Sequence, residues 1–200
     1  MSKKKDFKFD KRADKYDEEF EGKLSEKFYN LVTENVILSD GFNVLDAGCG
    51  TGTVLRRLSE KCEINCFEID VEEKMLAQAH KKCPDMDIRL CSCDKTPFND
   101  GYFDVIVACM AYHHFPDKDK FAAEAARLLK PNGTLYIADP KFPLPVRKLM
   151  NTALSIHNVA GEFFSADEIS ANFAPYGFEK TSTKSNAYTQ IVIMSRKAMV

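Results

Sequence analysis

Residues 44–52 (Val-Leu-Asp-Ala-Gly-Cys-Gly-Thr-Gly) combine an apolar run, an acid and three glycines at alternate positions. Glycine adopts turns that other residues resist, and its missing side chain lets a ligand approach the backbone. Apolar Val54, Leu55 and Leu58 follow at helical spacing. A strand, a glycine turn and a helix N-terminus together form a cradle for a nucleotide-like cofactor, because free backbone N–H groups point at the ligand. We therefore predict the first βα turn of a Rossmann-like sheet.

The spacing of the glycines indicates which cofactor the turn suits. A dinucleotide fingerprint has the pattern G-x-G-x-x-G, whose third glycine lets helix and strand pack closely under a pyrophosphate. Here Gly48, Gly50 and Gly52 give G-x-G-x-G after Asp46. A tight connection that binds nothing is the alternative, because a glycine turn alone is a weak motif.

Length and composition favour one domain with a substantial core. The 200 residues, of which 44% are hydrophobic, can bury a substantial core, and the net charge of −2 argues against a general affinity for nucleic acid or anionic membranes. No stretch is apolar enough to span a bilayer, and none behind Met1 looks like an export signal. The seven cysteines lack a disulfide-framework pattern. The sequence thus predicts a cytoplasmic protein.

Strand and helix patterns alternate through the first two thirds of the chain. An amphipathic helix over 18–36 has one predicted apolar face, made of Leu24, Phe28, Leu31, Val32 and Val36. Strands are expected at 64–69, 88–91, 103–109 and 134–139, with helices at 72–82 and around 118–129 and a turn at 131–133. Such alternation argues for right-handed crossovers in a parallel sheet.

After residue 139 the pattern changes. Residues 140–162 hold three prolines and a short helical stretch at 146–156, and connections this long are often functional lids. Ser165 and Glu168 form a capping-box pattern that starts another helix, which is expected to end near Pro175 and Gly177. Residues 178–183 and 190–196 then predict an antiparallel strand pair.

Several segments resemble one family in the right order. The turn resembles motif I of class I S-adenosylmethionine-dependent methyltransferases. The segment 69–76, with Asp70 and Met75, resembles that family's second strand and the helix after it. The segment 93–98, with Asp94, resembles the region after the third strand, and 103–117 and 127–135 resemble the central strand and the approach to the next one. Residues 9–17 are similar to the small-molecule branch, which includes quinone-biosynthesis methyltransferases.

The resemblance implies a fold, a domain and a cofactor. It implies an α/β, Rossmann-like, seven-stranded, mostly parallel sheet with an antiparallel last strand and helices on both faces. Residues 1–200 would form a single methyltransferase domain, with an N-terminal lid and helix over 1–36 and a lid-like insertion at 140–162. The implied cofactor is S-adenosylmethionine, with S-adenosylhomocysteine as product. Its binding residues would be Asp46, Gly48, Gly50, Gly52, Asp70, Met75, Asp94 and Ala108.

Two of these roles have competing explanations. Asp70 would accept hydrogen bonds from the ribose hydroxyls, but it could also cap the following helix. Asp94 would bind the adenine amino group, and Ser92 or Cys93 could share that role because the interval from Asp94 to Phe98 is short for the family.

Methyl transfer is in-line displacement at an activated carbon, so it depends mainly on positioning. His113 is the candidate base because it follows the central strand and histidine titrates near neutrality. The alternative is that His113 and His114 only pack. Tyr16 could close over the donor or orient the acceptor.

The acceptor is predicted to be a small molecule. No Asn/Asp-Pro-Pro-aromatic motif follows residues 103–109, as it does in methyltransferases of nucleobase amino groups, and no basic, aromatic-interleaved strip suggests nucleic acid. The cysteine spacings favour buried thiols over a metal site. Two rival functions are an inactive donor-binding partner subunit and a nicotinamide oxidoreductase. Neither a membrane partner nor an oligomeric state is indicated.

Overall fold

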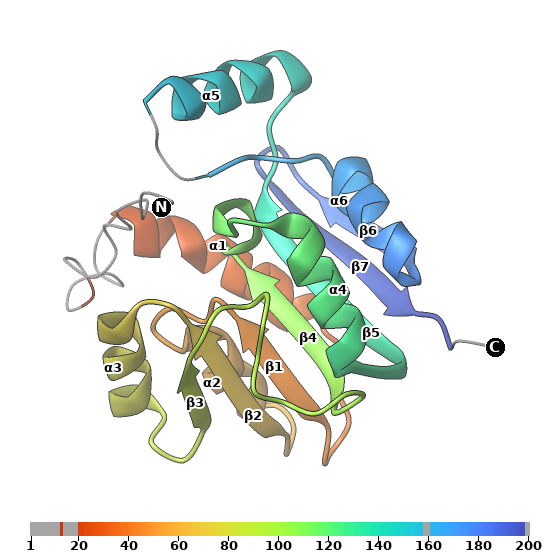
Figure 1. The fold of residues 1–200 in the computed structure, drawn as a ribbon. Helices are drawn as coiled ribbons and strands as arrows, with labels where there is room; N and C mark the ends of the chain where they lie inside the picture. The colour runs from red at the N-terminus through yellow and green to blue at the C-terminus, as the bar shows by residue number, and fades with distance from the viewer. Residues whose placement is uncertain (1–12, 14–19, 158–160, 199–200) are drawn as a thin grey trace.

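We analysed a computed structural model that describes residues 13, 20–157 and 161–198. Within this part of the chain, seven strands form one sheet in the order β3-β2-β1-β4-β5-β7-β6 (Figure 1). The strands are β1 (Asn43–Ala47), β2 (Asn65–Asp70), β3 (Asp87–Leu90), β4 (Phe103–Cys109), β5 (Leu129–Pro140), β6 (Phe178–Ser185) and β7 (Thr189–Arg196).

Neighbouring strands run parallel from β3 to β5. The last strand, β7, lies between β5 and β6 and is antiparallel to both. This is the predicted fold class, with the antiparallel strand inserted into the sheet. The first half of the sheet therefore has its carboxyl ends at one edge, which is where ligands bind in open α/β sheets.

Helices cover both faces of the sheet. They are α1 (Phe20–Asn35), α2 (Thr53–Ser59), α3 (Glu73–Lys82), α4 (Lys118–Leu128), α5 (Leu144–Ile156) and α6 (Ala166–Phe173), with short 3-10 turns at Tyr112–His114 and Ala174–Tyr176. Figure 1 shows α4 and α6 in front of the sheet and α1 behind it, whereas α5 stands apart at the carboxyl end of β5. No helix among the described residues has the length and apolarity needed to cross a bilayer.

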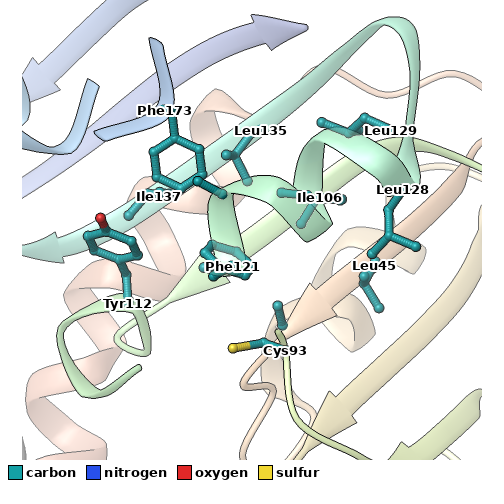
Figure 2. Packing of buried hydrophobic residues seen from close by; sticks show 14 of the residues in the cluster. Leu45, Cys93, Ile106, Tyr112, Phe121, Leu128, Leu129, Leu135, Ile137 and Phe173 are labelled. Carbon is teal, nitrogen blue, oxygen red and sulfur yellow. The ribbon is translucent and has the colours of Figure 1, made fainter. Parts of the chain in front are cut away.

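The alternation of strand side chains divides the core in two. On β4, Val105 and Val107 face α1 and α2, whereas Ile106 faces α4 and α6. In the part of the core under α4 and α6, Phe121 of α4 and Phe173 of α6 are directed at Ile137 and its neighbours (Figure 2). The edge-to-face geometry of these two rings, with centroids 5.8 Å apart, is the one aromatic pairs favour. A strand that is buried on both faces reads as a continuous apolar run, as β4 does.

Helix α6 begins where the sequence predicts. The Ser165 side chain accepts the Glu168 N–H, and the Glu168 carboxylate accepts the Ser165 N–H, so the capping box is complete. The helix ends in a 3-10 turn, and Gly177 follows with a φ of 83°. This short helix is thereby held against the sheet at both of its ends.

Two local predictions are wrong. The expected turn at 131–133 lies inside β5, where Asn132 takes a φ of 65° and the register with β4 shifts between Phe103 and Val105. The strand therefore absorbs a turn-like sequence as an irregularity instead of ending. Leu24 is 38% exposed, because the buried stripe of α1 runs through Ser25, Phe28 and Val32 and leaves Leu24 at its edge.

We predict that Phe173→Ala lowers the free energy of unfolding by about 3–5 kcal/mol, because it removes a fully buried ring that α6 places in the core. Chemical denaturation monitored by circular dichroism measures this change. Val71→Ala is the control, since Val71 is 54% exposed and its loss should change stability by less than about 0.5 kcal/mol. Equal effects of the two substitutions would contradict the packing described for α6.

Candidate functional site

The glycine turn between β1 and α2 is built from left-handed backbone conformations. Gly48, Gly50 and Gly52 have φ angles of 78°, 56° and 77°. Residues with a Cβ rarely adopt these values, so the alternate glycines are required by the path of the chain. The predicted turn is present at the carboxyl end of β1.

The turn's N–H groups are engaged by the protein itself. Those of Gly48 and Cys49 both donate to the Ile69 carbonyl oxygen, at 2.8 and 3.1 Å, and that of Gly52 donates to the carbonyl of Cys49. The Gly50 N–H donates to Asp70 Oδ2 at 2.9 Å. The expectation of free N–H groups is wrong for these four, because the turn folds back onto the end of β2, which accepts three of them, and the fourth is bonded within the turn.

A neighbouring side chain also lies close to each of the three glycines. A Cβ on Gly48 would lie 2.7 Å from Cβ of Ala111, and one on Gly52 would lie 3.0 Å from Cβ of Ala79 in α3. A Cβ on Gly50 would lie 3.3 Å from Cε of Met75, which is buried. Met75 thus contacts the turn, as its predicted role requires.

Asp46 and Glu68 form a pair of buried carboxylates beside this turn. They are aligned in register on β1 and β2 and are 1% and 0% exposed. None of their four oxygens has a hydrogen-bond partner in the described structure. Burial, followed by the charges of Glu68 and Asp70, holds the pKa of Asp46 well above its usual range, and burial raises the pKa of Glu68 to about 7. An unpaired buried carboxylate is costly, so this place favours a cation.

Asp70 lies at the carboxyl end of β2, where the sequence places it. Its Oδ2 accepts the Gly50 N–H and its Oδ1 accepts the Glu72 N–H, each at 2.9 Å. The second contact is the helix-capping type of bond that we considered as an alternative role. The two bonds hold the Asp70 carboxylate beside the glycine turn.

The other two predicted donor-binding residues differ in their surroundings. Asp94 lies half-buried in the turn after β3, and its neighbour Cys93 belongs to the core. Ala108 is fully buried in β4, one residue before the strand ends, and its side chain packs in the cluster under α4 and α6. Any contact from Ala108 to a ligand would therefore come from its backbone.

His113 is held by an acid that the sequence did not single out for this purpose. Asp139, at the end of β5, accepts the His113 N–H with Oδ2 and lies 2.9 Å from Nδ1 with Oδ1. Both residues are buried, and the ring of Phe163 stacks on the imidazole. A carboxylate at Nδ1 places the ring proton there and leaves Nε2 as an acceptor. No described residue bonds to Nε2, so this arrangement suits a base.

Two signals could have indicated this place from the sequence and the backbone. An acid at the end of a strand next to β4 is a natural partner for a histidine that follows β4. Met110, directly after β4, has a φ of 55°, and such strain in a non-glycine residue often marks functional sites. The other predicted catalytic residue, Tyr16, lies outside the described residues.

An open cleft of about 480 Å³ lies between α5 and α6. Phe163 and Phe164 line it together with polar side chains that are already paired. Arg147 forms an ion pair with Glu168, and the amide of Asn151 bonds both to the N–H and to the carbonyl of Phe163. Because Phe163 also stacks on His113, the cleft adjoins the candidate base.

Cysteines do not gather into a metal site in the part of the chain described here, where no group of three or more His, Cys, Asp or Glu residues could hold an ion. Burial raises the pKa of the Cys49, Cys93 and Cys109 thiols, which makes them unreactive.

Residues 45–137 match the profile of the methyltransferase domain family. In sequence and fold the chain resembles class I S-adenosylmethionine-dependent methyltransferases. A demethylmenaquinone methyltransferase of Thermotoga maritima is 28% identical over 178 residues, which cover 87% of this chain and 77% of the relative. An uncharacterized methyltransferase of Schizosaccharomyces pombe is 36% identical over 112 residues, or 50% of this chain. The chain spans only 39% of that relative's length.

Solved structures share the methyltransferase fold. A putative methyltransferase of Haloferax volcanii, in complex with the Trm112 methyltransferase activator, superposes with a TM-score of 0.84 at 19% identity. The match covers 98% of this chain and 100% of that one. This likeness extends over the whole sheet, including the carboxyl end of β1 where the glycine turn lies.

We predict that Glu68→Gln stabilises the ligand-free protein at pH 8 by up to about 3 kcal/mol. The pKa of Glu68 is about 7 in the folded protein against an ordinary value of 4.5. Between these values the folded protein binds more protons than the unfolded chain, so stability falls as pH rises, and the amide removes this loss.

Denaturation curves between pH 5 and pH 8 test this, and the difference between variant and native protein should fall to less than about 1 kcal/mol at the acidic end. Glu63→Gln is the control, because Glu63 is an exposed acid just before β2. A Glu68→Gln protein that is less stable at pH 8 would mean that a partner holds this carboxylate.

Proposed function

We propose that the protein transfers a methyl group from S-adenosylmethionine to a small-molecule acceptor. The observation that carries the proposal is the unpaired, buried carboxylate of Asp46 beside a glycine turn at the carboxyl end of β1. When bound, S-adenosylmethionine supplies a methyl carbon activated by a sulfonium, and it also carries an ammonium group. A site with an unpaired buried carboxyl group suits a ligand with a sulfonium and an ammonium group better than a dinucleotide with its anionic pyrophosphate.

Asp46 and Asp70 have different tasks in this proposal. Asp46 pairs with positive charge on the donor, because none of the described residues neutralises it. Asp70, at the carboxyl end of β2 beside the glycine turn, accepts the ribose hydroxyls. Met75, Asp94 and the backbone at Ala108 complete the proposed donor pocket, and Gly48, Gly50 and Gly52 keep the turn in place.

His113 removes a proton from the acceptor in the proposed mechanism. Nε2 takes the proton, while Asp139 keeps Nδ1 protonated and fixes the plane of the ring. A base is needed when the acceptor carries an acidic O–H or C–H group. The Thermotoga maritima relative is named as a demethylmenaquinone methyltransferase, and an aromatic acceptor of that general kind would suit the aromatic side chains beside His113.

The rival functions are not favoured. The similar proteins named above are methyltransferases, which supports transfer over hydride chemistry. A buried His–Asp pair beside the turn supports turnover over donor binding alone. The acceptor assay detects S-adenosylhomocysteine release in a screen of phenols, quinols and amines. Because the Haloferax volcanii protein is in complex with an activator, the screen includes an arm with a Trm112-type protein.

We predict opposite effects of Asp46→Asn on stability and on binding. The substitution removes an unpaired buried charge, so the ligand-free protein should become more stable, while the donor should bind at least about tenfold more weakly. Calorimetry with S-adenosylmethionine and thermal denaturation without it measure the two effects. Unchanged affinity in the folded variant would rule out Asp46 as the donor's counter-charge.

Asp70→Ala should weaken donor binding by about tenfold to a few hundredfold, since hydrogen bonds to a charged group contribute about 1.5–3 kcal/mol. Calorimetry with S-adenosylhomocysteine and with NAD is run in parallel on the native protein. NAD binding as tight as that of S-adenosylmethionine would overturn the proposed function.

Asp139→Asn should lower kcat/KM by about a hundredfold or more and leave donor affinity within about twofold, because Asp139 acts through His113. His113→Gln should lower kcat/KM at least as much, because it removes the base itself. Glu162→Gln is the matched control, since the exposed Glu162 bonds His113 only through its backbone N–H. If Asp139→Asn weakens donor binding as much as turnover, the pair has a structural role only.

A further inference from the structure

Helix α5 bonds to the protein through two polar side chains, beside the partly buried Met150 and Leu154, and leaves apolar side chains exposed on its outer face. Arg147, 7% exposed, makes a bidentate ion pair with Glu168 in α6, and Asn151 is bonded to the backbone of Phe163. On the outer face Val146, Leu149 and Ile156 are 45%, 71% and 74% exposed. A surface helix ordinarily has the opposite arrangement.

Exposed apolar side chains are concentrated at this end of the molecule. Among the described residues nine large apolar side chains are exposed, and four of them (Leu144, Val146, Leu149 and Ile156) belong to α5. A fifth, Tyr188, is 67% exposed in the loop between β6 and β7, where its carbonyl accepts the Lys141 N–H at 2.8 Å. Figure 1 shows α5 above this end of the sheet, away from the two helical layers. A gathering of this kind marks an interaction surface.

The charges around α5 indicate the kind of partner. The chain has no acidic residue between Asp139 and Glu162, although acids outnumber Lys and Arg by 30 to 28 over the whole sequence. Lys141 and Lys148 flank the apolar outer face, while Arg147 is taken up by its ion pair. The helix itself carries basic and no acidic residues, and its acidic neighbours Glu162 and Glu168 lie on the cleft side, away from the outer face. An apolar helix face flanked by basic residues is the pattern of helices that lie in the surface of an anionic bilayer.

We propose that the α5 outer face, made of Val146, Leu149 and Ile156, docks on an anionic lipid surface. The apolar side chains enter the region between headgroups and acyl chains, and Lys141 and Lys148 contact the anionic headgroups. The helix lies in the plane of the membrane and does not cross it. The overall charge of −2 predicts no membrane partner. The average over the whole chain does not show that residues 140–161 contain no acid.

This docking has a consequence for the acceptor, which rests on the proposed function. The base His113 and the cleft between α5 and α6 lie at the same end of the sheet as the outer face. A lipophilic acceptor dissolved in the bilayer would therefore enter directly beside the base. Docking itself is measured without any methyl transfer, so its failure and the failure of the proposed function are distinguishable.

Sedimentation with vesicles tests the proposal on the full chain. The protein should bind vesicles of phosphatidylcholine mixed with phosphatidylglycerol more tightly than vesicles of phosphatidylcholine alone, and added salt should weaken the binding. Leu149→Gln combined with Ile156→Gln should lower binding by about tenfold or more, because the two largest exposed apolar side chains of the face are lost. Lys148→Gln should reduce only the preference for anionic vesicles.

Ile37→Gln is the matched control, since Ile37 is an equally exposed apolar residue, at 77%, between α1 and β1. This variant should bind vesicles like the native protein. The proposal is overturned if native protein binds neither kind of vesicle, or if Ile37→Gln loses binding as the double variant does. It is also overturned if the native protein is a dimer that the double substitution dissociates, because the face would then join two copies of the chain.

Discussion

The close approach of the glycine turn to the end of β2 is the constraint on which the site depends. Two N–H groups of the turn share the Ile69 carbonyl, and a side chain on Gly48 or Gly52 would collide with Ala111 or Ala79. These contacts fix where β1 ends relative to β2. Since Asp46 and Glu68 are in register on those strands, the same constraint places the two carboxylates side by side in a buried environment. The glycines are thus required by internal packing before any ligand arrives.

Burying these two carboxylates without partners costs the folded protein electrostatic free energy. Buried carboxylates without partners favour their protonated forms, and burial accordingly raises the pKa of both Asp46 and Glu68. Evolution for stability alone would replace them with apolar residues, so their presence supports a role that needs negative charge. Their effect on each other also matters, because each charge makes ionisation of its neighbour harder. A cation beside Asp46 would lower the cost of ionising both carboxyl groups.

Periodicity accounts for what the sequence predicts well. The strand at Phe103–Cys109 is apolar almost throughout because helices cover both of its faces, and the capping box marks the start of α6 by local hydrogen bonds alone. The pairing of His113 with Asp139 is different, since it arises only because β4 and β5 are neighbours in the sheet. Side-chain partners across strands are not encoded in local spacing. For the same reason the sequence indicated free N–H groups in the turn, three of which in fact bond to β2.

Which face of α5 meets the protein is the least predictable feature of the structure. It bears on both the candidate base and the proposed docking face. Its amphipathic pattern is readable, but a pattern alone does not say which face meets the protein. The choice is made by Glu168 and by the backbone of Phe163, which bind Arg147 and Asn151 and so turn the apolar face outward. The segment after α5 then returns to the candidate base, where the Glu162 N–H donates to the His113 carbonyl and Phe163 stacks on the imidazole. Helix α5 and His113 are therefore held by one set of contacts, so a partner that binds the outer face acts on the surroundings of the base.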